Sequence, residues 1–239
     1  MNNNAKQLNV LQIILLHLTP GLPVLAIAFI LSSPYCAIGL PFVMSIYLSI
    51  ALGLIPTQLL IMYFISRRSG RKIRDIVCFT EGTSFIRTVL WVLPLYAFMG
   101  FIFSALPDIE KPLWTMFNWV PDWFRINIDI LKDRQSLILP TIILAFIFNG
   151  LFGPITEELY FRGFLLPRMS RMGKLAPIVN VVLFSIYHFF TPWENITRIL
   201  AITPYVYAVW YKRNIRIGMI VHCLGNLTGI LFTAMYLWS

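Results

Sequence analysis

The sequence contains few charged residues for its length. Only 12% of its 239 residues are charged and 58% are hydrophobic, whereas soluble domains carry about 25% charged and about 45–50% apolar residues. This composition excludes an ordinary soluble domain and indicates a polytopic membrane protein. The net charge of +9 does not indicate nucleic-acid binding, because most basic residues lie in short segments between apolar runs. Such segments are typical of topology signals and of contacts with anionic lipids.

Cysteine is scarce, and no internal repeat or low-complexity segment is present. Cys36, Cys78 and Cys223 are odd in number and fit no metal-binding spacing, so we interpret them as small hydrophobic residues. The apolar run near the N-terminus lacks a convincing cleavage site. We therefore expect a retained first span and not a removed signal peptide.

Apolar runs long enough to cross a bilayer, about 20 residues each, recur along the chain. They predict an all-α fold and a single integral-membrane domain over 1–239, in which about seven spans surround a polar intramembrane cavity. The expected spans are approximately 9–31, 36–66, 85–106, 137–166, 176–190, 196–211 and 217–238. Between the third and fourth, the segment 107–135 contains Trp114, Trp119 and Trp123 among charges. This segment is either an interfacial element or an ordinary loop with buried aromatic residues.

Several expected spans contain helix-breaking residues. The first is expected to kink near Pro20, and the second to tilt or break at Gly53 and Pro56. In the fourth, Gly153-Pro154 is expected to interrupt the helix, which then restarts at Pro154. The glutamates at 157 and 158 would then lie in or just after a first turn, where the helix dipole favours negative charge.

Basic clusters indicate the orientation of the chain. Alternating crossings place the clusters at 67–74, 168–174 and 212–216 on the same side as the N-terminus. The positive-inside rule predicts that this side is cytoplasmic. We therefore expect a multi-pass protein of the cell membrane with a cytoplasmic N-terminus.

Glu157, Glu158 and Arg162 lie within the fourth expected span. Each such charge costs roughly 2.5–3.5 kcal/mol at membrane depth, so three in six positions indicate a functional site; the alternative is a salt bridge that only locks two helices together. Glu158 and Arg162 have the i,i+4 spacing of an intrahelical pair. Glu157 points about 100° away from its neighbour, which leaves it as the uncompensated carboxylate for acid–base chemistry.

Two histidines in other spans can complete such a site. His188 lies near the end of the fifth expected span, with Phe184 four residues earlier to back its ring, and His222 lies in the seventh with Asn226 four residues later. We expect these polar residues to share one cavity with Glu157. A carboxylate and an imidazole can activate water, and a second imidazole and an amide can stabilise an oxyanion.

Other kinds of site are less well supported. No Ser or Cys nucleophile has a base at suitable spacing, so direct attack by water fits better than a covalent intermediate. Glutamate and two histidines could bind zinc, but a His-Glu-x-x-His motif is absent. We therefore favour no metal or other cofactor, with zinc as the alternative. The remaining histidine, His17, is expected to be structural.

The polar motifs together resemble those of a known family. In chain order they are Glu157-Glu158-x-x-x-Arg162, Phe184-x-x-x-His188 and His222-x-x-x-Asn226. This set is similar to the three signature motifs of the CAAX-protease and bacteriocin-processing family, the Abi-type intramembrane endopeptidases. The resemblance covers about 157–226, within a catalytic core expected over 137–238, and the first 150 residues carry none.

The resemblance implies a helical bundle around a conical cavity that opens to one side of the membrane. It implies that Glu157 with His188 activates water and that His222 with Asn226 stabilises the oxyanion. It assigns supporting roles to Glu158 and Arg162. Eukaryotic members remove the last three residues of prenylated CAAX proteins, and many prokaryotic members process peptides or serve in self-immunity. The family was long regarded as zinc-dependent and later as glutamate-type.

Three functions are compatible with these features. The first is an intramembrane endopeptidase that cleaves near the C-terminus of a prenylated or hydrophobic peptide or protein. The second is a non-catalytic membrane scaffold or bacteriocin self-immunity protein of the same fold. The third is a proton-coupled transporter, because glutamate and histidine lie within the membrane, although no inverted repeat supports it.

Overall fold

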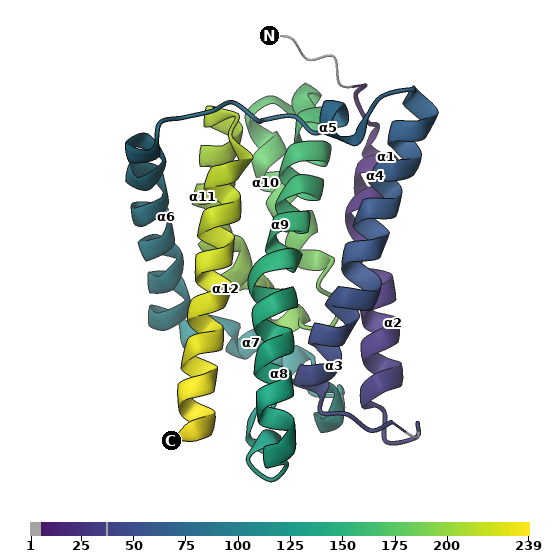
Figure 1. Cartoon of the computed structure of the whole chain (residues 1–239), viewed down its shortest axis with the longest axis vertical. Helices are drawn as coiled ribbons and strands as arrows, with labels where there is room; N and C mark the ends of the chain where they lie inside the picture. The colour runs from purple at the N-terminus through teal and green to yellow at the C-terminus, as the bar shows by residue number, and fades with distance from the viewer. Residues whose placement is uncertain (1–5, 37) are drawn as a thin grey trace.

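The computed structural model describes residues 6–36 and 38–239, and over these residues the fold is all-helical (Figure 1). The one exception to helices and loops among them is an isolated β-bridge between Thr80 and Asn214. The predicted all-α class is therefore confirmed. The helices run mostly along the long axis of the molecule and surround the site described below.

The N-terminal part forms two long antiparallel rods. In the first rod, α1 and α2 meet next to Pro20, where a kink was expected, and Thr19 and Pro20 keep helical backbone angles. The second rod contains a π-helical stretch, η1, that includes Gly53. The elements are α1 (Val10–Leu18), α2 (Gly21–Ser32), α3 (Phe42–Ser49), η1 (Ile50–Leu54) and α4 (Ile55–Ser69). An exposed capping box of Asn9 and Gln12 begins α1, and the left-handed Gly70 ends α4.

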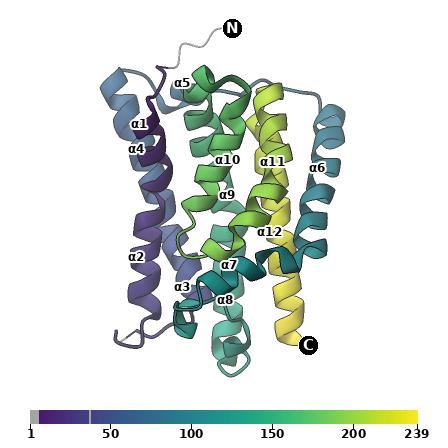
Figure 2. The ribbon, with the colours of Figure 1, turned by 180° about the vertical axis from the view of Figure 1, so that it is seen from behind.

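The middle of the sequence forms one long helix and several short helices. After α5 (Ile73–Ile76), the helix α6 (Phe85–Ala105) follows. The short elements are η2 (Pro107–Glu110), α7 (Lys111–Met116), η3 (Asp122–Phe124), η4 (Asp129–Leu131) and η5 (Gln135–Leu137). Seen from behind, the part around α7 crosses the bundle from the end of α6 toward α3 (Figure 2). Trp119 is exposed whereas Trp114 stacks on Trp193; an interfacial location for this segment stays a prediction.

The helix that carries the glutamates is continuous, which corrects the expected interruption at Gly153-Pro154. It consists of α8 (Ile138–Leu144), the π-helical η6 (Ala145–Phe152), α9 (Gly153–Glu157) and the π-helical η7 (Glu158–Leu165). Gly153 keeps helical backbone angles and donates to the carbonyl of Phe148, five residues earlier. Widening the turn in this way accommodates the missing N–H of Pro154 without breaking the helix.

The C-terminal part packs three helices against this one. The elements are η8 (Leu166–Leu175), α10 (Ala176–Ile186), η9 (Pro192–Glu194), α11 (Asn195–Lys212) and α12 (Ile215–Trp238). Gly173 has a φ of 55° and reverses the chain before α10. The helix α10 ends at Ile186. His188 was expected within a helix, but it lies in the turn that follows α10.

Within the part of the chain that the structure describes, five helical stretches are long and apolar enough to cross a membrane, by length and composition. They are Val10–Ser32, Phe42–Ser69, Phe85–Ala105, Gln135–Ile186 and Ile215–Trp238. The expected count of about seven is not confirmed. The stretch Gln135–Ile186 contains both the fourth and the fifth expected spans, which the reversal of the chain at Gly173 separates. The helix α10 has only 11 residues of its own, and α11 is not among the five stretches. The multi-helix, integral-membrane character of the chain is nevertheless clear.

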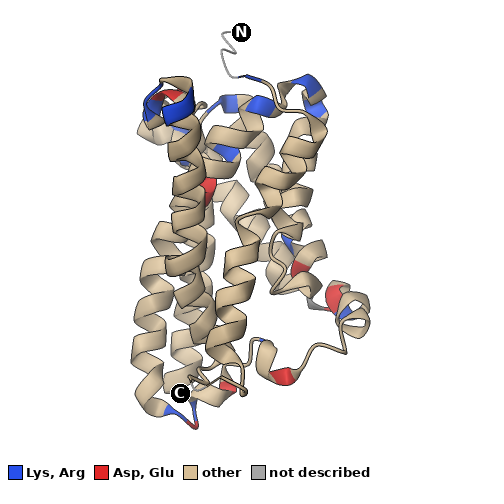
Figure 3. Cartoon of the chain, turned by 90° about the vertical axis from the view of Figure 1, so that its right-hand side faces the viewer, with Lys and Arg blue, Asp and Glu red and all other residues tan. Residues whose placement is uncertain are grey.

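Charge is unevenly distributed along the bundle. Lys and Arg gather at the end from which the N-terminus emerges, where the basic segments between helices meet (Figure 3). Away from the helix ends, the bundle shows few charged positions in this view, and these include both acidic and basic ones. This asymmetry is the pattern that the positive-inside rule describes.

Polar contacts attach α1 to the glutamate helix. His17 is fully buried; its Nδ1 donates to the carbonyl of Ile13 at 2.7 Å, and its Nε2 accepts from Asn180 at 3.0 Å. Asn180 also donates to the carbonyl of Phe161 at 3.0 Å. Tyr160 donates to the carbonyl of Leu16 at 2.7 Å. His17 is thus satisfied by packing partners, in agreement with its expected structural role.

The contact between α2 and the turn after α10 depends on the absence of a side chain at Gly21. A Cβ there would collide with the carbonyl oxygen of Tyr187 and lie 3.0 Å from the ring of Phe189. We predict that Gly21→Ala lowers the free energy of unfolding by about 1–3 kcal/mol, measured by thermal unfolding in detergent. Gly82→Ala is the matched control, because nothing lies within 4 Å of its Cβ position. Equal stability of the two variants would contradict the prediction.

Candidate active site

A buried ion pair lies in the glutamate helix. Arg162 Nη1 is 3.3 Å from Glu158 Oε1, and neither side chain is exposed. The hydroxyl of Tyr205 on α11 donates to the same carboxylate oxygen at 3.1 Å and accepts from Arg162 Nη2 at 3.2 Å. The Phe184 ring of α10 lies 4.0 Å from the guanidinium carbon. The intrahelical pair that the i,i+4 spacing predicted is therefore present, and two other helices complete it.

The second carboxylate oxygen of Glu158 approaches the backbone of α12. This oxygen, Oε2, is buried and has no hydrogen-bond partner. It faces Gly218, where a Cβ would collide with it. Because Gly218 has no side chain, α12 packs close enough to Glu158 for His222, one turn later, to reach the glutamates.

His222 lies between the two glutamates. Its Nδ1 is 3.1 Å from Glu158 Oε1, and its Nε2 is 3.7 Å from Glu157 Oε2. Successive helical residues point about 100° apart, which suggested separate surroundings for the two carboxylates. Instead, the imidazole of His222 on α12 lies between the two carboxylates and faces each of them with a different ring nitrogen. The two glutamates are therefore parts of one cluster.

Glu157 has a second partner that sequence reasoning missed. The Tyr187 hydroxyl donates to Glu157 Oε1. Tyr187 is buried and stacks on Phe161, with ring centroids 5.0 Å apart. Its only signal in the sequence is its position directly before His188. This bond fixes one carboxylate oxygen and leaves the other toward His222.

His188 lies on the opposite wall from Glu157. Its Nδ1 donates to the carbonyl of Phe184 at 2.9 Å, and the Phe184 ring packs edge-on against the imidazole at 5.1 Å. Phe184 thus backs the imidazole as its spacing suggested, although His188 is no longer helical. With Nδ1 engaged, Nε2 is the nitrogen of His188 that is available to a ligand.

Asn226 contacts the π-helical stretch of the glutamate helix. Its Nδ2 donates to the carbonyl of Asn149 at 2.8 Å. Since Gly153 donates to Phe148 in the five-residue pattern, the corresponding donor for Asn149 would be position 154, and proline has no N–H. Asn226 supplies that missing hydrogen bond. One amide hydrogen of Asn226 remains for a ligand.

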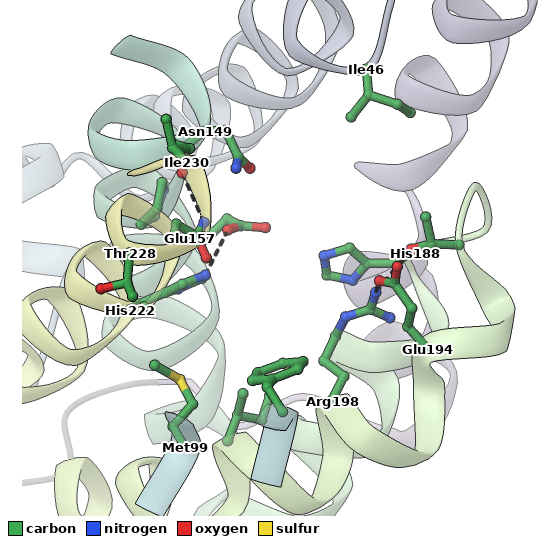
Figure 4. A pocket seen from close by; sticks show the side chains of 18 of the residues that line it. Ile46, Met99, Asn149, Glu157, His188, Glu194, Arg198, His222, Thr228 and Ile230 are labelled. Atoms are coloured by element: carbon green, nitrogen blue, oxygen red, sulfur yellow. Dashed lines mark hydrogen bonds and ion pairs between the residues drawn. The ribbon is translucent and has the colours of Figure 1, made fainter. Parts of the chain in front are cut away.

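These residues line one cavity of about 530 Å³. The four predicted residues Glu157, His188, His222 and Asn226 all lie on its wall, whereas Glu158 and Arg162 lie behind it, fully buried. In Figure 4, Glu157 and His222 are on one side and His188 is on the other, with open space between them. The structure therefore brings the four residues together from three separate parts of the chain; their roles stay predictions.

Arg198 is a further residue of this cavity that was not identified from the sequence. Its guanidinium donates to Glu194 Oε2 at 2.5 Å, Thr191 Oγ1 at 2.8 Å and Asn195 Oδ1 at 3.2 Å. Glu110, in the segment after α6, adds a second negative charge nearby, and burial raises the pKa of Glu110. Glu194 and Arg198 have i,i+4 spacing, a signal that could have been recognised. Their network holds the turn that carries His188.

The site does not fit a metal ion. Among residues 6–36 and 38–239, no three His, Cys, Asp or Glu side chains are placed to hold one. The physical reason is that the two glutamates approach opposite nitrogens of His222, so they do not converge on one point. His188 lies across the cavity, and its Nδ1 is engaged by the backbone. We derive no step through zinc.

The two glutamates should differ in their effect on stability. We predict that Glu158→Ala lowers the free energy of unfolding by about 3–5 kcal/mol, because it leaves Arg162 buried without its partner. Glu157→Ala should cost only about 1 kcal/mol, the value of one neutral hydrogen bond. Unfolding in detergent measures both. Replacing Glu158 and Arg162 together by leucine should recover most of the loss, and equal losses in the two single variants would contradict the prediction.

Comparison with known proteins supports the resemblance that the motifs suggested. The family model described as Rce1-like, type II CAAX prenyl endopeptidase, matches residues 139–228, a range that contains all three motifs. No curated protein and no solved structure matches the chain. Over residues 139–228 this membrane-embedded chain is thus similar to the Rce1-like CAAX prenyl endopeptidases, and its resemblance to the CAAX-protease family is confirmed.

Proposed function

We propose that this protein is an intramembrane endopeptidase of the glutamate type. It hydrolyses a peptide bond near the C-terminus of a prenylated or otherwise hydrophobic peptide or protein. The observation that carries this proposal is the placement of Glu157 and His188 on facing walls of one cavity inside a bundle of apolar helices. The family match, which is to proteases, supports it.

The proposed reaction begins with a water molecule between Glu157 and His188. Glu157 takes a proton from the water as the oxygen attacks the carbonyl carbon, and Nε2 of His188 orients the water from the other side. The carbonyl oxygen becomes an oxyanion. The C–N bond then breaks, and Glu157 returns the proton to the leaving amine. Tyr187 holds one oxygen of Glu157, so that the other presents a defined lone pair to the water.

Asn226 and His222 stabilise the oxyanion in this proposal. The free amide hydrogen of Asn226 is one donor. Nδ1 of His222 is engaged with Glu158, so Nε2 can donate only when both ring nitrogens carry a proton. Glu158 and Arg162 touch no substrate and act by holding His222 in place.

The surroundings of the cavity suit a hydrophobic substrate in the bilayer. Phe103 of α6 and Phe232 of α12 line it and are 50% and 64% exposed, so that apolar residues lead from the lipid-facing surface to the polar site. We propose that the protein lies in the cell membrane with its N-terminus in the cytoplasm, since the basic segments gather at that end of the bundle.

Loss of Glu157 or His188 should abolish cleavage. We expect Glu157→Ala and His188→Ala to reduce kcat by at least about 10²–10⁴-fold, the range for a general base. The assay follows release of the C-terminal fragment of a prenylated peptide by mass spectrometry. Glu81→Ala, which removes an exposed glutamate, is the control. Cleavage by both variants at the wild-type rate would refute the mechanism, and a wild-type protein without turnover would favour the scaffold or self-immunity function.

Activity should not depend on a metal ion. Because the described part of the chain offers no group of three metal ligands, we predict that dialysis against a chelator leaves kcat unchanged. Elemental analysis of the purified protein should find far less than one zinc per chain. Loss of activity on chelation that added Zn²⁺ restores would show that this prediction is wrong.

A further inference from the structure

Three arginine side chains are buried in the part of the chain that the structure describes, and they differ in their counter-charges. Arg162, Arg168 and Arg198 are 0%, 6% and 8% exposed. Arg162 lies 3.3 Å from Glu158, and Arg198 lies 2.5 Å from Glu194. Among the described residues, no acidic side chain forms an ion pair with Arg168. A buried cation without a negative partner is costly, so a counter-charge is missing at Arg168.

The guanidinium of Arg168 is held in place by backbone carbonyls and an aromatic ring. Its Nη1 donates to the carbonyl of Ile76 on α5 at 3.0 Å and to that of Phe164, near the end of the glutamate helix, at 2.5 Å. The guanidinium carbon lies 4.1 Å from the centre of the Phe164 ring. These contacts orient the side chain, but none of them supplies a full negative charge.

Part of the Arg168 guanidinium remains available to a ligand. An arginine has five N–H donors, and the two on Nη1 serve the carbonyls. Nε and Nη2 donate to no described residue, and neither nitrogen is fully enclosed by the protein. These two nitrogens form the side of the guanidinium whose parallel N–H groups can bind two oxygens of one anion. Arg168 therefore presents a fixed pair of donors at the surface.

The surroundings of Arg168 add positive charge. Arg71 is exposed and lies near enough to act on Arg168 electrostatically. Asp75, which precedes Ile76 on α5, is exposed and lies 3.6 Å from Arg74 instead. All these residues belong to the end of the bundle at which Lys and Arg gather (Figure 3). An anion beside Arg168 would thus lie in a positive field.

Backbone hydrogen bonds from two other segments fix the position of Arg168. The N–H of Leu8, before α1, donates to the carbonyl of Arg168 at 3.0 Å. The N–H of Cys78, after α5, donates to the carbonyl of Gly163 in the glutamate helix at 2.8 Å. The donors of Arg168 therefore lie at a junction of three parts of the chain, and an anion could bind there without rearranging them.

We propose that Arg168, together with Arg71, forms a binding site for a phosphate group at the basic end of the bundle. Phosphate accepts parallel hydrogen bonds from a guanidinium and carries the negative charge that the site lacks. It can come from the headgroup of an anionic phospholipid or from a soluble phosphate. Neither arginine lines the active-site cavity, so the site is separate from it. Bound phosphate holds the guanidinium that caps Phe164 and thereby stabilises the end of the glutamate helix.

Ligand-dependent stability tests the site in the wild-type protein. The full chain in a neutral detergent is unfolded by heat with inorganic phosphate, with phosphatidylglycerol, or with sodium chloride at the same ionic strength. Because a ligand that binds the folded state raises Tm, we expect a rise with a phosphate-bearing probe and none with chloride or with diacylglycerol of the same chains. A rise with inorganic phosphate supports a site for phosphate itself, and a rise with phosphatidylglycerol alone identifies the lipid headgroup as the source. No rise with either probe would overturn the proposal.

Substitutions locate the site by calorimetric titration of the probe that raises Tm. We expect Arg168→Gln to raise the dissociation constant at least about tenfold, because charge-assisted hydrogen bonds are lost. Arg87→Gln removes an exposed charge near the start of α6 and is the matched control, which should bind as the wild type does. Arg168→Lys keeps the buried charge and serves where Arg168→Gln does not fold; it should also bind more weakly, because an ammonium group cannot form the parallel pair. Wild-type affinity in Arg168→Lys, or the same loss in Arg87→Gln, would overturn the proposal.

Discussion

The buried pair of Glu158 and Arg162 is the interaction on which the rest of the structure depends. Both charges are completely removed from solvent, and the effective penalty for burying an ion is several kcal/mol. The ions are tolerable only when neighbouring groups complete their coordination. Tyr205 of α11 and His222 of α12 bond to Glu158 Oε1, and the Phe184 ring of α10 lies against the guanidinium. The pair therefore sets the rotation of three helices around the glutamate helix.

That constraint also places the candidate catalytic groups. Once His222 is bound to Glu158, its second nitrogen faces Glu157, and Glu157 in turn accepts from Tyr187 next to His188. The π-helical turn before Pro154 leaves the carbonyl of Asn149 without a backbone donor, and Asn226 donates to this carbonyl. The turn thereby helps to place Asn226 on the cavity wall. These hydrogen bonds leave Nε2 of His188 and one amide hydrogen of Asn226 available on the cavity wall.

Features that depend on one helix could be predicted from the sequence, and features that depend on helix rotation could not. Long apolar runs indicated the all-α fold, and i,i+4 spacing predicted the Glu158–Arg162 pair. The position of His222 between both glutamates joins residues 64 positions apart, and no local pattern determines how α12 turns toward α9. The same holds for Tyr187 and Glu157, and for Tyr205. The expected count of about seven spans is not confirmed, because α10 is short and α11 is not among the five apolar stretches. The expected interruption at Pro154 was wrong, because a π-helical turn accommodates the proline.

The turn after α10 is fixed at both of its ends. At its start, Tyr187 donates to Glu157, and the carbonyl of Tyr187 lies against Gly21 of α2. At its far end, Arg198 binds Thr191 and Glu194. His188 lies between these two attachments, and its Nδ1 is engaged by the carbonyl of Phe184. The imidazole is therefore held in one position opposite Glu157 by contacts that involve no ligand, and such preorganisation is what a site that positions a reacting molecule requires.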